Sequence, residues 1–295
     1  MTATGRRRRR ETWLGYALVA PSLALFALVY IYPVAYSAYV SVLEWDLIGP
    51  ARWVGLANYR ELMSAEFWEV ITNTAQYSIG VVVLSQALGL ALAVLLNNRT
   101  RLGALFQASI FSSYVVSWVA VSLLWIWLLD PQYGLVTYLL RLVGLGAVNW
   151  LGDHRVALWS LVLVTVWKTV GYPMVIYLAG LQAIPGDVYE AAALDGADGW
   201  RRFRHITWPL LTPTTLFLVV TLTIASFQGF DIVKIMTQGG PVTATMIYVY
   251  YIYEQAFQYF KLGKASAAVV VFFTLILALT AVQWWFFRRR VHYAV

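Results

Sequence analysis

The sequence has 295 residues, of which 61% are hydrophobic and only 12% are charged. Because a soluble domain carries about 25% charged residues, this composition excludes an ordinary soluble protein and predicts a polytopic membrane protein. The chain has no cysteine, which excludes disulfides, thiolate metal sites and cysteine nucleophiles. Its formal net charge of +7 is clustered beside apolar segments, which indicates membrane orientation rather than nucleic-acid binding.

Six apolar segments are each long enough to cross a membrane as a helix. They run over about residues 13–42, 73–96, 103–129, 155–182, 209–236 and 265–287. The first follows a basic run at residues 6–10 and is about 30 residues long, whereas the core of a signal peptide has about 7–15. We therefore expect an uncleaved first span with a cytoplasmic N-terminus, broken or kinked at Pro21 and Pro33.

The segments between spans predict short interfacial elements. Residues 44–72 are polar, and short amphipathic helices are expected at 58–62 and 67–71, lying on the outer face. The apolar piece at residues 135–143 is too short to span. Residues 243–264 are aromatic and are expected to be partly helical on the same face.

Lysine and arginine residues are distributed unequally between the two predicted faces. They cluster at residues 6–10, 99–101, 201–204 and 288–290, and the positive-inside rule places these clusters in the cytoplasm. The predicted all-α chain then has a cytoplasmic N-terminus at residues 1–12, one six-helix transmembrane domain at 13–287 and a cytoplasmic C-terminus at 288–295.

The charged loop at residues 184–208 is the most informative stretch. Pro185 and Gly186 end the preceding helix, and Asp187 is expected to cap a new helix with Glu190 completing a capping box. Gly196 suits the C-terminal cap of that helix. Asp198 could cap a second short helix, and Pro209 fits the first turn of the next span. A solvated connection between two spans is the alternative.

The same loop resembles the signature loop of the membrane subunits of binding-protein-dependent ABC importers. The resemblance rests on Glu190-Ala191-Ala192, on Gly196 after three intervening residues, and on Ile206 and Pro209. Trp208 stands where that family usually has leucine. The resemblance implies a coupling helix that docks into a cleft of a separate ATPase. It assigns ATPase coupling to Glu190, Ala191, Ala192, Asp195 and Gly196.

Other motifs are similar to the carbohydrate-type permeases of this family, those for maltose, other oligosaccharides and glycerol 3-phosphate. They include Tyr32-Pro33, Asn149-Trp150-Leu151, Val166-Trp167-Lys168, Phe230-Asp231, and residues 54–59, 178–185 and 237–241. The resemblance implies the six-helix transmembrane domain of a type I ABC importer in the plasma membrane of a prokaryote. The implied partners are a second permease subunit, two ATPase subunits that bind ATP and Mg, an extracytoplasmic solute-binding protein, a carbohydrate and membrane lipid, without nucleic acid.

No pattern predicts an active site or a cofactor in this chain. The three histidines have no metal-ligand spacing, and a Walker glycine loop is absent. Lys168 lies 13 residues after Arg155, about 20 Å along a helix and close to the membrane midplane. A charge there costs about 2.5–3.5 kcal/mol, so it has either a role facing a cavity or a structural role.

Interrupted helices near the midplane are typical of transporter binding sites. Interruptions are expected at residues 171–173 and 226–230, and Tyr114 and Ser117 are polar groups at helical spacing in the third span. In the maltose-type permeases these three regions line the sugar site. The predicted lining residues are Tyr114, Ser117, Trp167, Lys168, Gly171, Tyr172, Ser226, Gln228, Gly229 and Phe230. Ordinary helix packing is the alternative for each of them.

These patterns predict the permease subunit of an ABC importer, which is not catalytic by itself. It would form the membrane path for a sugar or a sugar-like solute. A secondary transporter or channel that works alone is the alternative, and it gives no reason for the motif between Glu190 and Pro209.

Overall fold

The computed structural model describes residues 3–97 and 100–288, and side chains from Thr12 to Phe286 apart from those at 98 and 99. These residues are mostly helical, which confirms the predicted all-α fold. The contacts divide them into two compact units. One unit takes the residues up to Ser64 and from 252 to 274, and the other takes 65–251 and those from 275 onward. Arg99 of the predicted basic cluster at residues 99–101 and residues 289–295 of the predicted C-terminal tail lie outside the described residues, as do residues 1–2 and 98.

The first unit contains the first span and the segments at its end. Its elements are α1 (Ala3–Phe26), η1 (Ala27–Ile31), α2 (Tyr32–Val40), β1 (Leu43–Glu44), β2 (Arg52–Trp53), α3 (Ala57–Leu62), η3 (Glu254–Gln258) and the first half of α16 (Leu262–Arg288). The strands pair antiparallel, with Leu43 opposite Trp53 and Glu44 opposite Arg52. The expected short helix near 58–62 is therefore present as α3.

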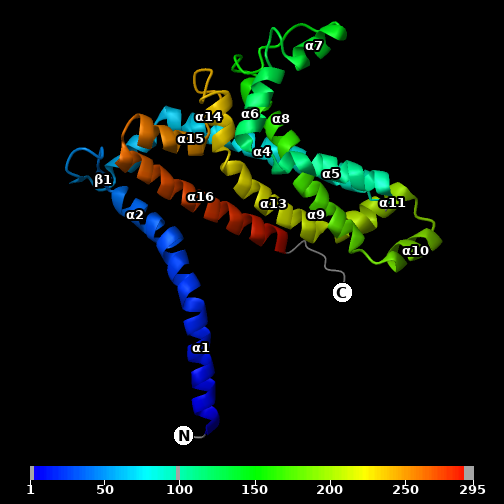
Figure 1. Ribbon diagram of the computed structural model, residues 1–295, viewed down its shortest axis with the longest axis horizontal. Coiled ribbons are helices and arrows are strands. Elements are labelled where there is room, and N and C mark those ends of the chain that lie inside the picture. Colours follow the sequence, from blue (N-terminus) through cyan, green and yellow to red (C-terminus); the bar gives the residue numbers. More distant parts are fainter. Residues whose placement is uncertain (1–2, 98–99, 289–295) are drawn as a thin grey trace. The chain divides into compact units, whose positions relative to one another are not determined.

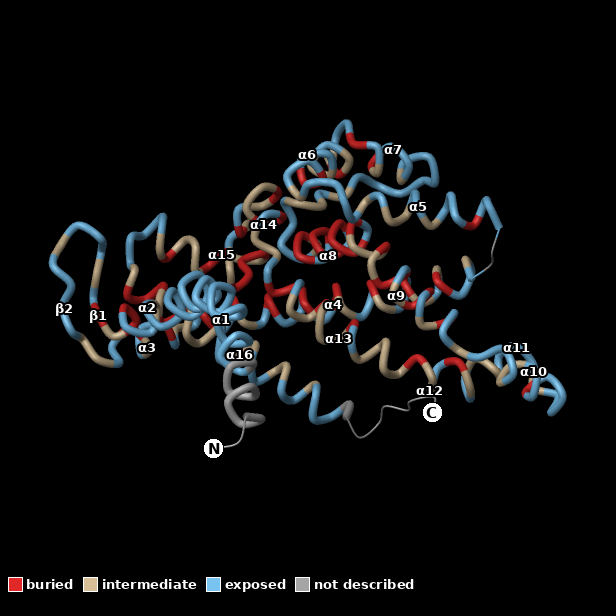
Figure 2. Tube along the Cα trace, turned by 60° about the horizontal axis from the view of Figure 1, so that its bottom comes forward, coloured by how far each residue is buried: buried red, intermediate tan, exposed pale blue. Residues whose placement is uncertain are grey.

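The first span is one unbroken helix from Thr12 to Val40, so the break expected at the prolines does not occur. The α-helix continues through Pro21 without a break. Ahead of Pro33 the chain widens into the π-turn η1, in which the Tyr32 N–H bonds to the Ala27 carbonyl. A wider turn before a proline gives its ring room without ending the helix. Figure 2 shows exposed residues along α1.

The second unit is a helical bundle around one long helix. Its elements are α4 (Ala65–Leu95), α5 (Arg101–Val115), α6 (Trp118–Leu128), α7 (Leu135–Leu142), α8 (Ala157–Thr169), α9 (Gly171–Gln182), α10 (Gly186–Leu194), α11 (Gly199–Arg202), η2 (Phe203–Thr207), α12 (Trp208–Leu210), α13 (Thr212–Phe227), α14 (Phe230–Met236) and most of α15 (Tyr248–Tyr253). Helix α4 packs against α8, α9 and α13 (Figure 1). It therefore forms the axis on which the broken helices of this unit are assembled.

Six membrane spans are consistent with these lengths. Three helices, Thr12–Val40, Ala65–Leu95 and Leu262–Phe286, are long and apolar enough to cross a membrane alone. Three helix pairs reach that length only together, and each is bent at a short break. The bends measure 100° between α5 and α6, 47° between α8 and α9, and 62° between the Gly199–Leu210 run and α13.

The second, third and fifth spans differ from the sequence prediction, the fifth because its helix pair runs from Gly199 to Phe227 rather than over residues 209–236. The second span begins at Ala65 rather than near residue 73, so the expected separate helix at 67–71 is the first part of α4. No proline or glycine lies between Ala65 and Ile79 to end a helix. The third span, expected to be continuous, turns sharply where Val116 and Ser117 adopt extended backbone with ψ of 142° and 139°.

The core of the second unit lies where α4, α9 and α13 meet. Met174, Tyr177 and Leu181 of α9 pack there against Leu218 and other leucines of the following span. Figure 2 shows buried residues along α4 and α8. The helices approach closely because small residues face neighbours: a Cβ at Gly89 would stand 2.9 Å from Pro173 Cβ.

Candidate functional site

The loop between α9 and α12 contains the short helix α10, which begins two residues earlier than predicted. Pro185 occupies the N-cap position with extended backbone (φ −60°, ψ 139°), and no side chain caps the helix. Asp187 is therefore in the first turn rather than at the cap, and the expected capping box with Glu190 is wrong. Proline suits the N-cap because its ring fixes φ and it has no N–H to leave unpaired. The helix therefore starts at Gly186. The Asp187 carboxylate still lies near the positive end of the helix dipole.

The end of α10 is closed as the sequence predicts. Gly196 has a φ of +75°, the left-handed conformation that glycine adopts without strain. The Ala197 N–H donates to the Ala192 carbonyl at 3.0 Å, and the Gly196 N–H donates to the Ala193 carbonyl at 3.1 Å. This pair of bonds is the Schellman motif, which satisfies the last carbonyls and reverses the chain.

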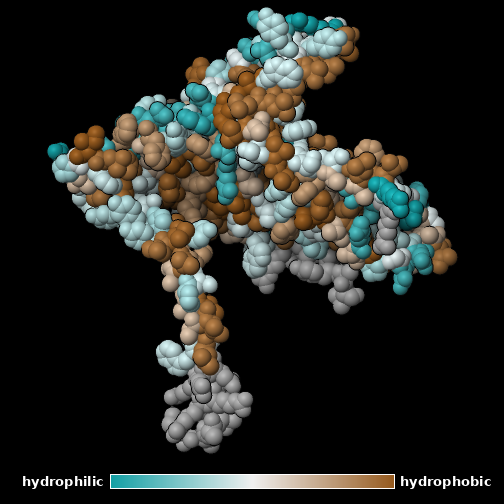
Figure 3. Space-filling view, viewed as in Figure 1, coloured by the Kyte–Doolittle hydropathy of each residue, from teal (hydrophilic) through white to brown (hydrophobic). Residues whose placement is uncertain are grey.

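The predicted coupling residues lie on two faces of α10. Glu190, Ala191, Asp195 and Gly196 are exposed, while Ala192 is buried against the chain itself. Leu194 is 90% exposed, although it is a large apolar residue at the tip of a polar loop. In Figure 3 hydrophilic residues gather over α10 and α11. This helix thus presents a mixed acidic and apolar surface to the solvent.

The rest of the loop is a second, longer helical run. Asp198 Oδ1 accepts from the Arg201 N–H at 2.7 Å, which confirms the predicted cap of the second short helix. A hydrogen bond of 3.1 Å between the Tyr189 and Thr207 hydroxyls ties α10 to this run. Pro209 lies within the run rather than opening the next span, because η2 carries the helix through to Leu210. The bend comes two residues later, at Leu211.

The sharp bend in the third span places the predicted lining residues of the third and fourth spans together. Lys168 of α8 is 3% exposed, and its ammonium donates to the Tyr114 carbonyl at 2.9 Å and to the Ser113 carbonyl at 3.4 Å. These carbonyls belong to the last turn of α5, where intrahelical partners run out. The same ammonium lies 4.7 Å from the Trp118 ring centroid. Lys168 thus closes the open end of a broken helix.

Aromatic rings line the same bend. The Tyr114 and Tyr172 rings stack with centroids 5.5 Å apart, and the Trp167 and Trp125 rings meet edge to face at 5.5 Å. Gly171 allows α5 and α9 to touch, since a Cβ there would lie 2.7 Å from Phe111 Cα. Tyr114, Trp167 and Tyr172 keep exposed or half-exposed faces. Ser117 is exposed at the bend itself.

The remaining predicted lining residues lie at the second break, between α13 and α14. The Ser226 hydroxyl is 2.5 Å from the Ser78 hydroxyl of α4, and Phe230 packs against Tyr250 with centroids 6.0 Å apart. A Cβ at Gly229 would stand 3.0 Å from the Tyr77 hydroxyl. Gln228 is exposed. The structure therefore separates the predicted residues into two groups rather than one.

Tyr77 of α4 lies between α8 and the second break, and it was not predicted from the sequence. Its hydroxyl lies 2.8 Å from the Thr165 hydroxyl of α8, one turn before Lys168 and Thr169, while the same hydroxyl faces Gly229. Trp125 was missed as well. The sequence did show a polar hydroxyl, that of Tyr77, among the apolar residues of a long span. It did not show which other helices pack against the face of α4 that carries Tyr77. Among the described residues, no three His, Asp or Glu side chains gather in a way that could hold a metal ion.

The chain is similar to known proteins over nearly its whole length. Residues 85–292 match the family described as the binding-protein-dependent transport system inner membrane component. The trehalose/maltose transport system permease protein MalF of Thermococcus litoralis is 36% identical over 88% of this chain and 88% of its own length. The sn-glycerol-3-phosphate transport system permease protein UgpA of Agrobacterium fabrum is 35% identical over 95% of this chain and 96% of its own.

Solved structures share the fold. A bacterial ABC transporter involved in the import of the acidic polysaccharide alginate gives a TM-score of 0.83 at 24% identity, covering 96% of this chain and 98% of that one. The alginate transporter in complex with an alginate pentasaccharide-bound periplasmic protein gives 0.85 at 23%, covering 98% and 99%. The family match over residues 85–292 and the two relatives at 36% and 35% identity show that the chain belongs to the binding-protein-dependent transport system inner membrane component family and is a multi-pass membrane permease of it.

Proposed function

We propose that this chain forms part of the membrane path of an ATP-driven importer for a sugar or a sugar-like solute. The single observation that best supports this is α10, a separate short helix that ends in a Schellman motif and presents Glu190, Ala191 and Leu194 to the solvent. Leu194, 90% exposed beside Asp195 at the tip of a polar loop, would suit a contact with a partner surface. A transporter that works alone has no use for such a surface.

The partners follow from this proposal. Two ATPase subunits bind ATP and Mg and receive α10, so this chain needs no cofactor of its own. A second permease completes the path, and an extracytoplasmic solute-binding protein delivers the solute. The family is described as binding-protein-dependent, which supports the solute-binding protein as a partner. With the first span entering from the cytoplasm, the α10 loop and both termini lie on the ATPase side.

The helix breaks and the relatives both support a sugar or a sugar-like molecule as the solute. Sugars are bound by aromatic faces together with hydrogen-bonding side chains. The Tyr114–Tyr172 stack and the Trp167–Trp125 pair supply aromatic faces beside the bend, and Gln228 is an exposed amide at the second break. Two relatives are named for transport of trehalose and maltose and of sn-glycerol 3-phosphate. Alternating access would open this region first outward and then inward.

Reconstitution of the complete importer tests the coupling part of the proposal. The full chain, expressed with its ATPase and its second permease, is placed in proteoliposomes with its solute-binding protein. Glu190→Lys should lower solute-stimulated ATP hydrolysis by about tenfold, a loss of about 1.4 kcal/mol in docking free energy. Glu66→Lys reverses an equally exposed acidic charge in the first turn of α4 and should have no effect.

The solute part is tested in the same proteoliposomes. Trp167→Ala, Tyr114→Ala and Gln228→Ala should each lower sugar uptake while the ATPase still co-purifies. Normal uptake in all three variants refutes the proposed lining. Sugar uptake by the chain alone, without an ATPase, would instead establish a stand-alone transporter.

A further inference from the structure

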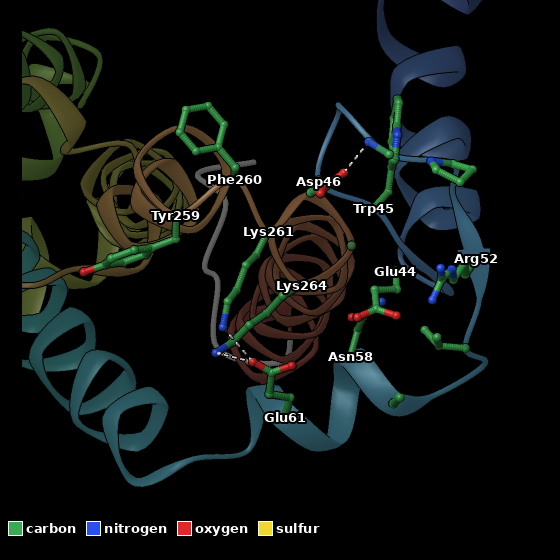
Figure 4. Close-up of a pocket in the computed structure, with 15 residues that line it drawn as sticks. Glu44, Trp45, Asp46, Arg52, Asn58, Glu61, Tyr259, Phe260, Lys261 and Lys264 are labelled. Carbon is green, nitrogen blue, oxygen red and sulfur yellow. Dashed lines mark hydrogen bonds and ion pairs between the residues drawn. The ribbon is translucent and has the colours of Figure 1, made fainter.

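A polar cavity of about 610 Å³ lies in the first unit, far in sequence from the breaks that line the proposed path. This volume is within the range of about 300–1,000 Å³ that small-molecule sites occupy. Its walls come from the β1–β2 hairpin, α3, the end of η3 and the first turn of α16. Figure 4 shows the side chains that line it.

Two ammonium groups share one carboxylate on one flank of this cavity. Lys261 Nζ and Lys264 Nζ lie 3.3 Å and 3.4 Å from the same oxygen, Oε1 of Glu61 (Figure 4). The Lys264 side chain is only 9% exposed, and each ammonium has three donors to satisfy. One carboxylate cannot neutralise both lysines, so this flank keeps one positive charge and several unused N–H donors.

The other charged groups that line the cavity are Glu44, Arg52 and Asp46. Glu44 and Arg52 stand opposite each other in the strand register and lie together in Figure 4. Asp46 Oδ1 accepts from the Ile48 and Gly49 N–H groups at 3.1 Å and 2.8 Å, which lowers the pKa of its carboxyl. The lining as a whole carries three carboxylates and three cations, and the flank at Lys261 and Lys264 is where cations outnumber carboxylates.

The cavity lies at the level where two spans end. The span Thr12–Val40 stops beside β1, and Gly263 and Lys264, which line the cavity, are in the first turn of the span Leu262–Phe286. Trp45, Tyr259 and Phe260 also line it, and such aromatic residues are typical of the headgroup level of a bilayer. The first turn of the 27-residue helix α16 adds a partial positive charge there.

The walls are fixed before any ligand arrives. Asn58 Nδ2 donates to the Ser41 and Leu43 carbonyls at 2.9 Å and 2.8 Å, and the Leu262 N–H donates to the Trp45 carbonyl at 3.0 Å. Gly263 lets the Leu43 carbonyl reach α16, where any Cβ would collide with it. A preorganised cavity loses less free energy on binding than one that must form.

We propose that this cavity binds the phosphate group of a membrane phospholipid, with Lys261 and Lys264 as its donors. Phosphate oxygens would take the N–H groups that Glu61 leaves unused, forming charge-assisted hydrogen bonds. The lipid is favoured over a soluble phosphate because the lysines stand at the membrane end of α16, where headgroups are already concentrated. The bound headgroup would join the first outer loop to the last span.

Lipid titration of the full-length chain in detergent, followed by native mass spectrometry, tests the proposal. Dioleoylphosphatidylglycerol should bind more tightly than dioleoylglycerol, which has the same acyl chains but no phosphate. Lys261→Gln should weaken phosphatidylglycerol binding about tenfold. Glu61→Gln should strengthen it, because the competing carboxylate is removed. Arg60→Gln, an exposed cation on α3 outside the cavity, should change nothing.

Three results would overturn the proposal. The first is equal binding of the two lipids. The second is unchanged binding in Lys261→Gln. The Lys261 side chain is 56% exposed, so this variant should fold even if a variant at buried Lys264 does not. The third is displacement of the lipid by millimolar inorganic phosphate, which would assign the site to a soluble anion. A phosphatidylglycerol with a photoreactive headgroup should crosslink to peptides containing residues 259–264.

Discussion

The ammonium of Lys168, on the fourth span, donates to the main-chain carbonyl of Tyr114, on the third span, at 2.9 Å. The third span turns by 100° just after this carbonyl, which leaves the last carbonyls of α5 without helical partners. A buried cation in a span is costly unless backbone carbonyls satisfy it. The lysine and the broken helix therefore stabilise each other, and ring stacking of Tyr114 on Tyr172 strengthens the same contact.

Lys168→Met should destabilise the chain by about 1–3 kcal/mol, because two carbonyls at the bend lose their donor. Lys168→Arg should keep most of that stability, since a guanidinium can donate to both carbonyls. The measurement is the thermal unfolding midpoint of the purified chain in detergent. An unchanged midpoint combined with a raised KM for solute would show instead that the lysine serves the solute.

Gly171→Ala should destabilise the chain by about 1–3 kcal/mol through overpacking, because its Cβ would press on the backbone of Phe111 and Ile110. Gly186→Ala is the matched control, since a Cβ there meets nothing within 4 Å. Both variants are compared by thermal unfolding in detergent. Equal midpoints would mean that α5 and α9 are not held as closely as described.

Gly196→Ala should strain the end of α10 by about 1 kcal/mol, because alanine must adopt a φ of +75° there. Space is not the cause, since nothing lies within 4 Å of the added Cβ. Hydrogen exchange of the amides at 192–197 should become about fivefold faster. Gly199→Ala, equally open but without a positive φ, should leave this exchange unchanged.

Two cysteine substitutions test the orientation of the chain, which contains no other cysteine. Val242 and Leu194 are 93% and 90% exposed, so their reactivity toward an impermeant maleimide should differ only by the side of the membrane. In intact cells Val242→Cys should be labelled and Leu194→Cys should not. After permeabilisation both should react. Labelling of Leu194→Cys in intact cells would place the α10 loop outside.

The Glu61 carboxyl predicts a dependence of stability on pH. Burial opposes its ionisation, but Lys261 and Lys264 outweigh burial and hold its pKa below 4.5. A carboxyl with a lowered pKa stabilises the fold above pH 4.5, and this contribution disappears as pH falls through the folded-state pKa. Because Glu61 is half exposed, the contribution is at most about 1 kcal/mol.

Glu61→Gln should therefore unfold more easily than the unchanged chain at pH 7 and equally at pH 3. The comparison is made in detergent without phospholipid, so that lipid binding does not enter. Glu66→Gln removes an exposed carboxylate on α4 and should change neither value. A constant difference between Glu61→Gln and the unchanged chain at every pH would contradict the assigned ion pairs.

Local signals in the sequence determined much of this protein. The apolar segments predicted six spans because membrane thickness fixes the length of a helix that crosses it. Gly196 predicted the reversal after α10, and Asp198 predicted a cap, because both act within one turn of their own position. The loop motif at 190–209 predicted the family, since its residues are adjacent in the chain.

Only the tertiary structure decided where the helices break and what satisfies them. No proline or glycine marks the bend at Val116 and Ser117, and the carbonyls that it frees accept from Lys168 of another span. The start of α10 was misplaced because Pro185 competes with Asp187 for the cap. Tyr77 lies between α8 and the second break, and the two lysines meet Glu61 across 200 residues. Such contacts depend on which helix faces meet, which a single sequence does not encode locally.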